Sequence, residues 1–427
     1  MSARIAVIGT GYVGLTTGVC LAHLGHTVVC ADVDATKVSR LSAGDMPIVE
    51  DGLADLLHDG LASGRLSFVV GAAAAVADCD IAFLCVPTPQ GSDGSADLSY
   101  IEAASAEIGP LLPAGAIVVN KSTVPVGSAH AVEVVIRRDD IHVVSNPEFL
   151  REGSAVHDFL HPDRVVVGAD DRAAAERVAA LYASLNARTI ITDPASAETI
   201  KYAANAFLAT KLSFVNAIAA ICEGVGADIE DVIAGIGSDS RIGEAFLRPG
   251  PGWGGSCFPK DSCALVKIAE NAGYEFDLLS GVITVNDQQL DRMATKVAAA
   301  VGGSLSGRTV AVWGLTFKAG TDDLRDSPAI AVIARLLHAG AHVVAHDPTV
   351  PARRYGVPAD AEIASTPLAA CQGADVLCVL TEWPDYRAVA PEDVASALAS
   401  PRVVDTRNLL DRDAWTSAGF VYDGVGR

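Results

Sequence analysis

The stretch PGPGWGGSCFPKD places a cysteine, Cys257, in a flexible loop that is dense in glycine. Lys260 and Asp261 follow closely, and a cation and a carboxylate near a thiol favour the thiolate or move a proton. Gly254 and Gly255 lack side chains, so a ligand has room to approach the backbone. Cys257 is therefore a candidate nucleophile. The alternative is a buried, inert cysteine beside a turn.

The composition is that of an acidic protein with ample apolar material. The chain has 427 residues, of which 50% are hydrophobic, and its formal net charge is −21. This length predicts two or three domains, and the charge argues against nonspecific binding to nucleic acid or an anionic membrane. The nine cysteines are scattered, without a CxxC pair, which favours a reducing cytoplasm and no metal site. No signal-peptide core and no run of about twenty apolar residues is present, so we expect no membrane span.

A glycine fingerprint comes after the first predicted strand, residues 4–8. The motif GTGYVG contains Gly9, Gly11 and Gly14, and an apolar helical pattern continues from it to about residue 24. In this setting the glycines permit a tight turn, close approach of a pyrophosphate, and packing of helix against strand. The next strand ends at Asp32, where an acid accepts hydrogen bonds from both ribose hydroxyls and favours NAD over NADP. The pattern predicts a dinucleotide-binding domain.

Polar loops come after three further predicted strands, at residues 80–86, 116–119 and 143–145. Ligands bind outside the carboxyl ends of parallel strands, so Thr88 and Thr123 are placed to line the cofactor cleft, unless they only terminate strands. The third loop, NPEFLREG, contains Glu148 and Glu152. Either acid is a general base if it is desolvated, and otherwise a solvated loop acid. Two more strands, at residues 164–167 and 188–192, complete this domain.

The middle of the chain reads as helical. Residues 198–223 contain no proline or glycine, which predicts one long helix buried between domains or subunits. Lys201 and Asn205 are four residues apart and share one face of it. A lysine in an apolar helix is costly unless its charge is used or paired. Helical patterning resumes from residue 263 to about residue 301. Between these helices Arg241 is either a surface residue or an anion clamp.

A second α/β unit begins near residue 307. A strand at 309–314, a helix at 328–338 and a strand at 341–345 repeat the start of the first domain without its glycines. Because Lys318 and Arg325 occupy the first turn instead, we expect a ligand other than an ordinary dinucleotide pyrophosphate. Strands at 374–380 and 402–405 complete the unit. The predicted fold class is α/β, with two Rossmann-like parallel-sheet domains joined by a long central helix and a helical middle domain. The predicted domains are 1–196, 197–302 and 303–427.

The motifs GTGYVGL, VPTP, STVPVG, NPEFLREG, GWGGSCFPKD and TFKAGTDDLRDSP occur in the order and spacing typical of one family. The chain resembles the UDP-glucose/GDP-mannose dehydrogenase family over essentially its whole length. Ser256, Phe258 and Lys260 surround Cys257 as in the branch that oxidises UDP-glucose, with the GDP-mannose branch as the alternative. The resemblance implies four-electron oxidation of a sugar-nucleotide primary alcohol to a carboxylate, with two NAD reduced in succession.

The resemblance also implies a catalytic set, which comprises Cys257, Lys201, Asp261, Asn205, Glu148 and Thr123. In the family's scheme Lys201, Asn205 and a water on Asp261 polarise the sugar oxygen. Cys257 traps the aldehyde as a thiohemiacetal, which is then oxidised to a thioester. Water activated by Glu148 or Asp261 releases the acid.

The same resemblance implies two binding sets. The implied NAD contacts are Gly9, Gly11, Tyr12, Val13, Gly14, Asp32, Lys37, Thr88, Thr123, Glu152 and Arg325. The implied sugar-nucleotide contacts are Glu148, Phe149, Leu150, Lys201, Asn205, Arg241, Phe246, Gly254 and Lys318. In the family the arginine matching Arg241 reaches the neighbouring subunit, which implies a homodimer built on the long helix. Two other classes are weighed: a two-electron hydroxyacid-type dehydrogenase, which needs no nucleophilic cysteine, and a non-catalytic nucleotide-sugar sensor.

Overall fold

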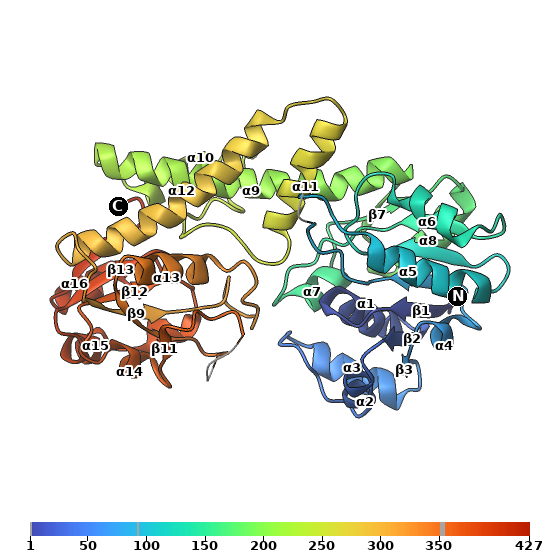
Figure 1. The fold of residues 1–427 in the computed structure, drawn as a ribbon, viewed down its shortest axis with the longest axis horizontal. Coiled ribbons are helices and arrows are strands. Elements are labelled where there is room, and N and C mark those ends of the chain that lie inside the picture. The colour runs from blue at the N-terminus through green and yellow to red at the C-terminus, as the bar shows by residue number, and fades with distance from the viewer. Residues whose placement is uncertain (1, 92–93, 351–354) are drawn as a thin grey trace. The chain divides into compact units, whose positions relative to one another are not determined.

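The computed structural model describes residues 2–91, 94–350 and 355–427 (Figure 1). The chain forms two compact units: Met1–Ala204 with Cys263–Tyr274, and Asn205–Ser262 with Glu275–Arg427. Each unit contains one β-sheet, which accounts for the two α/β regions expected from the sequence. The finer division at residues 196 and 302 stays a prediction.

The sheet of the first unit has eight strands in the order β3-β2-β1-β4-β5-β6-β7-β8. The first six strands in this order are parallel to their neighbours, whereas β7 pairs antiparallel with β6 and parallel with β8. The sheet is therefore parallel over most of its width, with a reversed pair at one edge, as is common in large α/β sheets. The strands are β1 (Arg4–Ile8), β2 (Thr27–Asp32), β3 (Leu66–Val70), β4 (Ile81–Leu84), β5 (Ile117–Asn120), β6 (His142–Ser145), β7 (Arg164–Gly168) and β8 (Arg188–Thr192).

Both faces of the first sheet are buried. Successive side chains of a strand point to opposite faces, so alternate residues of one strand belong to different apolar clusters. Ile5 and Val7 of β1 belong to one apolar cluster, and Ala6 and Ile8 to another. The near-continuous apolar runs seen in the sequence result from this double covering. The helical segments are α1 (Tyr12–His23), α2 (Ala35–Ser42), α3 (Leu53–Ala62), α4 (Ala73–Val76), α5 (Ser99–Ile108), η1 (Gly109–Leu111), α6 (Ser128–Ile136), α7 (Ala155–Leu160), α8 (Arg172–Ala180) and η2 (Ala183–Leu185).

The sheet of the second unit has six parallel strands in the order β11-β10-β9-β12-β13-β14. The predicted strands β9, β10, β12 and β13 are confirmed. The sequence analysis missed β11 and β14, which are short edge strands with one neighbour each and carry little apolar signal. The strands are β9 (Thr309–Trp313), β10 (His342–His346), β11 (Ala361–Ile363), β12 (Val376–Val379), β13 (Arg402–Asp405) and β14 (Val421–Gly424).

Helices also bury both faces of the second sheet. Val310 and Val312 of β9 pack in one cluster, and Ala311 and Trp313 pack in another. The predicted helix at 328–338 is confirmed as α13, and Pro328 fits its first turn because the missing N–H has no intrahelical partner there. The helical segments are α10 (Ile229–Gly237), α12 (Asp277–Ala300), α13 (Pro328–His338), α14 (Pro367–Cys371), η3 (Pro384–Ala388), α15 (Pro391–Ala397) and α16 (Arg412–Ser417).

The predicted long helix is α9 (Pro194–Val225), which contributes residues to both units. By length and mean hydropathy α9 is able to cross a membrane, a criterion that the core helix of a protein in water also meets. Its Glu198 is buried and accepts hydrogen bonds from the backbone N–H groups of Gly127 and Ala129, so this part of α9 packs against protein.

Candidate active site

Cys257 immediately precedes helix α11 (Phe258–Asn271). The sequence analysis placed Lys260 and Asp261 in a loop. This prediction was wrong, because both residues lie in the first turn of the helix. The carbonyl of Cys257 accepts a hydrogen bond from the N–H of Asp261 at 2.9 Å, and its Sγ lies 3.6 Å from the hydroxyl of Ser256. Cys257 is partly exposed, which contradicts the burial expected under the alternative of a buried, inert cysteine.

The loop before Cys257 is held by side-chain amides rather than being free. Asn216 accepts from the N–H of Gly250 at 2.8 Å, and Gln289 donates to the carbonyl of Gly250 at 2.7 Å. Asn286 binds both the N–H and the carbonyl of Trp253, at 2.8 and 3.0 Å. These bonds fix the backbone that leads to the cysteine, which differs from the flexible loop expected from its glycine content.

The glycines of this loop have a packing role that the sequence analysis did not foresee. A Cβ on Gly254 would lie 1.9 Å from the carbonyl oxygen of Asp326, and a Cβ on Gly255 would lie 2.8 Å from the ring of Phe317. Gly255 also has a φ of +82°, which disfavours other residues. The protein's own backbone, not a ligand, makes the close approach at Gly254. Its contact with a sugar nucleotide stays a prediction.

Asp261 is fully buried and both of its carboxylate oxygens are engaged. Asn205 donates from Nδ2 to Oδ2 at 2.6 Å, and Lys260 donates from Nζ to Oδ1 at 2.7 Å. The side chain of Lys260 is 19% exposed, so the pair is not deeply shielded from solvent. The structure thus brings together Asn205 and Asp261, two of the predicted catalytic residues. Asp261 lies one helical turn after Cys257 in the chain.

Lys201 and Glu148 form a buried ion pair in the first unit. Their Nζ and Oε1 atoms are 2.9 Å apart, and each side chain is only 4% exposed. The other carboxylate oxygen of Glu148 accepts from the N–H of Leu150 at 2.5 Å. Burial by itself raises the pKa of Glu148, but the charge and hydrogen bond of Lys201 outweigh it and hold that pKa below the usual value. Glu148 is therefore a desolvated carboxylate, not a solvated loop acid.

Phe149 carries cations near its ring. The guanidinium carbon of Arg164 lies 3.7 Å from the ring centroid, and Nζ of Lys201 lies 5.5 Å from it. Such cation–π contacts favour a fixed ring orientation. The NPEFLREG loop therefore presents both an ionised carboxylate and an oriented aromatic ring.

The glycine fingerprint has the geometry needed for a dinucleotide. Gly9 has a φ of +98°, and a Cβ on Gly14 would lie 1.9 Å from the carbonyl oxygen of Gly9, so neither position accepts a side chain. A Cβ on Gly11 would meet nothing within 4 Å, so open space lies beside the backbone at the start of α1. Open space at the helix N-terminus, where N–H groups are unpaired, fits a pyrophosphate. The adjacent Tyr12 and Val13 begin α1.

Asp32 stands at the carboxyl end of β2, where the sequence analysis expected a ribose contact. Its Oδ2 accepts from the N–H and hydroxyl of Thr10 at 3.0 and 2.5 Å, and from Nζ of Lys37 at 2.9 Å. Burial opposes ionisation of Asp32, but these hydrogen bonds hold its pKa far below the usual range. An ionised acid at this position suits the hydroxyls of a ribose.

Two further contacts tie the predicted cofactor residues to neighbouring loops. The hydroxyl of Thr88 donates to the carbonyl of Thr123 at 2.9 Å, so the loops after β4 and β5 are in contact. The hydroxyl of Tyr12 binds the carboxylate of Glu50, which also accepts from the N–H of Gly153 at 2.7 Å. Glu50 thereby joins the glycine fingerprint to the loop that contains Glu152. The sequence analysis missed Glu50 because no local motif marks it.

The remaining predicted residues lie in the second unit. Arg241 is exposed and pairs with Asp239 at 2.6 Å, and Arg325 is also exposed and pairs with Asp323 at 2.6 Å. Phe246 has a φ of 62°, a strained value for an aromatic residue, and Nζ of Lys318 lies 5.6 Å from the ring of Phe317. These contacts locate the residues but assign no ligand to them.

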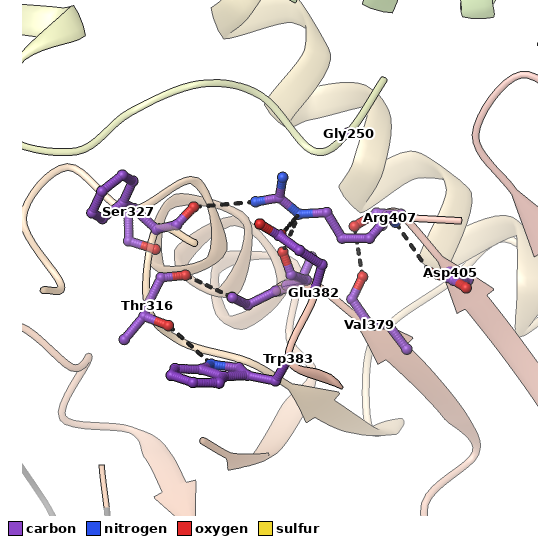
Figure 2. A network of polar contacts seen from close by, with 12 residues as sticks. Gly250, Thr316, Ser327, Val379, Glu382, Trp383, Asp405 and Arg407 are labelled. Carbon is purple, nitrogen blue, oxygen red and sulfur yellow. Dashed lines mark hydrogen bonds and ion pairs between the residues drawn. The ribbon is translucent and has the colours of Figure 1, made fainter. Parts of the chain in front are cut away.

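Arg407 is a candidate ligand-binding residue that the sequence analysis overlooked. It lies two residues after the end of β13 and donates to the carbonyls of Leu380 and Phe317 at 2.9 and 3.2 Å. Its Nε also pairs with Glu382 at 3.0 Å (Figure 2). The signal available in the sequence was a cation in the loop that follows a predicted parallel strand, where ligands bind. Within the described ranges no group of three or more His, Cys, Asp and Glu residues could hold a metal ion.

The structure thus combines two α/β sheets with a partly exposed cysteine directly before a helix, which is the architecture of an α/β protein with a candidate reactive thiol. Three family models of the UDP-glucose/GDP-mannose dehydrogenase family match in succession: the NAD binding domain at residues 3–186, the central domain at 195–288 and the UDP binding domain at 311–412. The chain belongs to this family.

Individual relatives agree with the family assignment. A UDP-glucose 6-dehydrogenase of Rhizobium meliloti (strain 1021) is 46% identical, with 99% of each chain covered. One of Bacillus subtilis (strain 168) is 44% identical, covering 99% of this chain and 93% of the relative. The solved structure of a UDP-glucose dehydrogenase from Pyrobaculum islandicum has a TM-score of 0.92 at 38% identity, covering 100% of this chain and 98% of that one.

Proposed function

We propose that this protein oxidises UDP-glucose to UDP-glucuronate, reducing two NAD to NADH for each sugar. The observation that carries the proposal is the arrangement around Cys257: a partly exposed thiol at the start of α11, with Asp261 in the next turn bonded to Asn205. A hydroxyacid-type dehydrogenase needs no such cysteine. The alternative within the family is oxidation of GDP-mannose or another nucleotide sugar.

The first oxidation requires an oxygen-binding group at the sugar's primary alcohol. Lys201 and Asn205 lie one turn apart on one face of α9, and both are buried. We assign them, with a water held by Asp261, to polarising the hydroxyl and stabilising the charge that develops on its oxygen. NAD, when bound, accepts the hydride from the substrate carbon in each of the two oxidations. The hydroxyl proton leaves to water.

Cys257 makes the second oxidation possible by covalent capture. Its sulfur bonds to the aldehyde carbon, and a proton on the carbonyl oxygen gives a thiohemiacetal. Loss of a hydride from that carbon and a proton from that oxygen gives a thioester. The N-terminus of α11 favours an anionic sulfur, because the unpaired N–H groups there carry partial positive charge.

Hydrolysis then releases the acid and restores the thiol. Water adds to the thioester carbon, its proton goes to a general base, and the sulfur leaves as thiolate. Glu148 suits this role because it is an ionised carboxylate out of contact with bulk water. Asp261 is the other candidate base, but both of its oxygens are already engaged. Thr123 helps to hold the reactive geometry.

The two ligands are assigned to the two sheets and the middle of the chain, in the three-domain division 1–196, 197–302 and 303–427. The fit for NAD rests on the open space at Gly11, the tight packing at Gly14 and the ionised Asp32. Lys37, Thr88, Glu152 and Arg325 complete the proposed cofactor contacts. For the sugar nucleotide, cations at the second sheet suit the diphosphate, and Arg407 joins the residues that the family resemblance implies: Phe149, Leu150, Arg241, Phe246, Gly254 and Lys318.

The test is the yield of NADH per sugar consumed, with UDP-glucose and GDP-mannose offered separately, for the wild type and Cys257→Ser. We expect two NADH from UDP-glucose alone, and a fall in turnover of at least about a thousandfold in the variant. The matched control is Cys263→Ser, which alters a partly buried cysteine within α11. One NADH per sugar, or a fully active Cys257→Ser, contradicts the covalent scheme. Two NADH from GDP-mannose transfer the specificity to the alternative.

We also propose a homodimer, with α9 at its interface. Phe207, Phe214 and Ile221 are spaced seven residues apart on α9 and are 66%, 52% and 57% exposed. An apolar stripe of this kind is costly to leave in water and suits the same stripe of a second copy. The mass in solution tests this: Phe214→Arg should give a monomer, whereas Val421→Arg, on the exposed edge strand β14, should remain a dimer. A cytoplasmic location stays a prediction.

A further inference from the structure

Lys121 is a buried lysine of the first unit that the reaction scheme does not use. It comes directly after β5 and is 5% exposed. Its Nζ donates to Oδ1 of Asn146 at 3.1 Å and to the hydroxyl of Tyr182 at 3.4 Å. Tyr182 donates in turn to the same Oδ1 at 2.7 Å, and Nδ2 of Asn146 donates to the carbonyl of Val166 at 2.8 Å. The ammonium is therefore fixed by a closed network of buried polar groups.

Among the residues that the structure describes, this network gives Lys121 no direct counterion. Both of its hydrogen-bond partners in the described chain are neutral, and burying an unpaired ammonium is costly. Burial lowers the pKa of Lys121 to about 8, whereas the charge of Glu148 acts in the opposite direction. The same two residues influence each other reciprocally, since Lys121 helps to hold the pKa of Glu148 below its usual value. Glu148 is thus the carboxylate that Lys121 faces electrostatically.

The groups facing this pair are few and identifiable. Lys201 from α9 bonds Glu148 directly, Tyr182 lies just after α8, and Cys85 just after β4. Burial raises the pKa of Cys85 to about 12 and that of Tyr182 still higher, so both are neutral near pH 7. Of the groups that the structure describes here, the charged ones are two ammonium groups and one carboxylate. These three groups together carry one surplus positive charge.

We propose that Lys121 is a positioning residue for the oxidation. Asn146 and Tyr182 fix its ammonium, which is the second buried cation beside Glu148. Because this second charge also stabilises the carboxylate of Glu148, Lys201 is free to bond the sugar oxygen. With Lys201 alone, the pair with Glu148 is neutral and an oxyanion finds no net positive charge there. With Lys121 present, Glu148 stays ionised even while Lys201 donates to the substrate. This inference rests on the proposed function, because it assigns Glu148 and Lys201 the roles given above.

Asn146 links this charge to the catalytic loop. It lies two residues before Glu148, and its backbone N–H donates to the carbonyl of Asn120 at 2.9 Å. Its side chain bonds Lys121, so the start of the NPEFLREG loop is anchored to the residue after β5. The ammonium therefore acts in two ways, through its charge and through the position of the loop.

The direct test is a pH titration of Glu148 by carbon-13 NMR on full-length protein labelled at the glutamate carboxyl carbon. The Glu148 resonance is assigned as the one missing from Glu148→Gln. In Lys121→Met, which keeps the apolar stem but loses the charge, the midpoint should rise by about one pH unit relative to the wild type. Lys121→Arg keeps the charge and should leave the midpoint near that of the wild type.

The rate profile gives a second readout. We expect the acid limb of kcat against pH, with UDP-glucose and NAD saturating, to move upward in Lys121→Met and to stay in place in Lys121→Arg. A merely structural role lowers kcat at every pH without moving the limb. Tyr182→Phe removes a hydrogen bond but no charge, so its limb should also stay in place. If Lys121→Met does not fold, Lys121→Gln replaces it in both experiments.

The outcomes separate this inference from the proposed function. An unchanged Glu148 midpoint in the neutral variant, or an equal shift in Lys121→Arg, overturns the role of Lys121. The titration uses no substrate, so it decides the question even for a protein that leaves UDP-glucose unoxidised. Failure of the wild type to form NADH from UDP-glucose refutes the proposed function alone.

Discussion

The two sheets of this protein begin with the same backbone device and then diverge. Gly9 after β1 and Gly314 after β9 both have a φ of +98°. Their N–H groups donate to Ala31 and His346, each at 2.8 Å, at the end of the neighbouring strand. The tight turn at the end of the first strand is therefore common to both units. It permits a binding site without specifying one.

The two units differ in the segment between this turn and the next helix. In the first unit residues 9–11 lead directly into α1, so a helix N-terminus faces the end of β1. In the second unit residues 314–327 intervene before α13, and Phe317 and Asp326 of this segment pack against the glycines of the cysteine loop. The first turn leaves open space beside the backbone at a helix N-terminus, where we propose that the pyrophosphate binds. The second supports the backbone before Cys257.

The acids at the ends of β2 and β10 diverge in the same way. Asp32 has an 11% exposed side chain and keeps Lys37 as a partner. Asp347 is 2% exposed, and its Oδ2 accepts from Leu315 N–H, from Thr316 and from the indole of Trp383. Figure 2 shows that indole also bonded to Thr316. Asp32 therefore remains accessible to a ribose, whereas the carboxylate of Asp347 is occupied by hydrogen bonds from the residues around it.

The largest expected effect is at the third glycine of the fingerprint. Gly14→Ala places a methyl group against the carbonyl of Gly9, so we expect a loss of about 3 kcal/mol in the free energy of unfolding and no measurable NAD binding. Urea denaturation and a fluorescence titration with NAD measure the two quantities. Gly11→Ala meets open space, so it should keep its stability and still bind NAD about tenfold or more weakly.

Gly314→Ala is the comparison variant in the second sheet, at the position that corresponds to Gly9. Its Cβ would lie 2.3 Å from Cβ of Thr381 at a φ of +98°, so it should also lose stability. NAD affinity of its folded fraction should equal that of the wild type. If Gly314→Ala weakens NAD binding as Gly14→Ala does, the two turns are not as different as their structures indicate.

The second prediction exchanges the two acids for amides. Asp347→Asn sets an NH2 group against buried N–H donors, which should cost about 2 to 3 kcal/mol of stability and leave the affinity for NAD unchanged. Asp32→Asn should do the reverse: a smaller effect on stability, about tenfold weaker NAD binding, and weaker discrimination against NADP. Thermal melts and NAD and NADP titrations on the same preparations compare them. Equal loss of NAD affinity in both variants contradicts the assignment.

The sequence predicted the parts of this comparison that depend on local pattern. Apolar runs between polar loops located most strands, and the glycine fingerprint located the tight turn between β1 and α1. The spacing of Lys201 and Asn205 on one helix placed two proposed site residues together. What it could not supply are the partners that come from distant segments, such as Glu148 for Lys201 and Asp326 for Gly254.

Three misses have identifiable causes. The start of α11 at Phe258 was overlooked although Pro259 in its first turn is a helix-start signal. Lys121 and Arg407 were passed over because each stands in a polar loop, and only the fold shows that one is buried and that the other ties strand ends together. Burial of a polar group is a property of the whole fold, so the sequence of the loop alone does not determine it.

The smallest predicted effect is at the residue before each acid, which is Ala31 in β2 and His346 in β10. Burial lowers the pKa of His346 below its usual value, so the unfolded chain binds a proton there more readily than the folded protein. Its contribution to stability is therefore complete above the usual histidine pKa of about 6.5 and declines as the pH falls through that value.

The variant His346→Gln removes this pH-dependent contribution to stability. Between pH 7.5 and pH 5.5, values about one unit on either side of that pKa, the melting temperature of the variant should fall by a few degrees less than that of the wild type. His338→Gln, at the end of α13, is the matched control and should behave as the wild type does. If the melting temperature changes equally with pH in all three proteins, His346 accepts its proton without destabilising the sheet. The exchange of Ala31 for His346 between the two sheets then has no effect on stability.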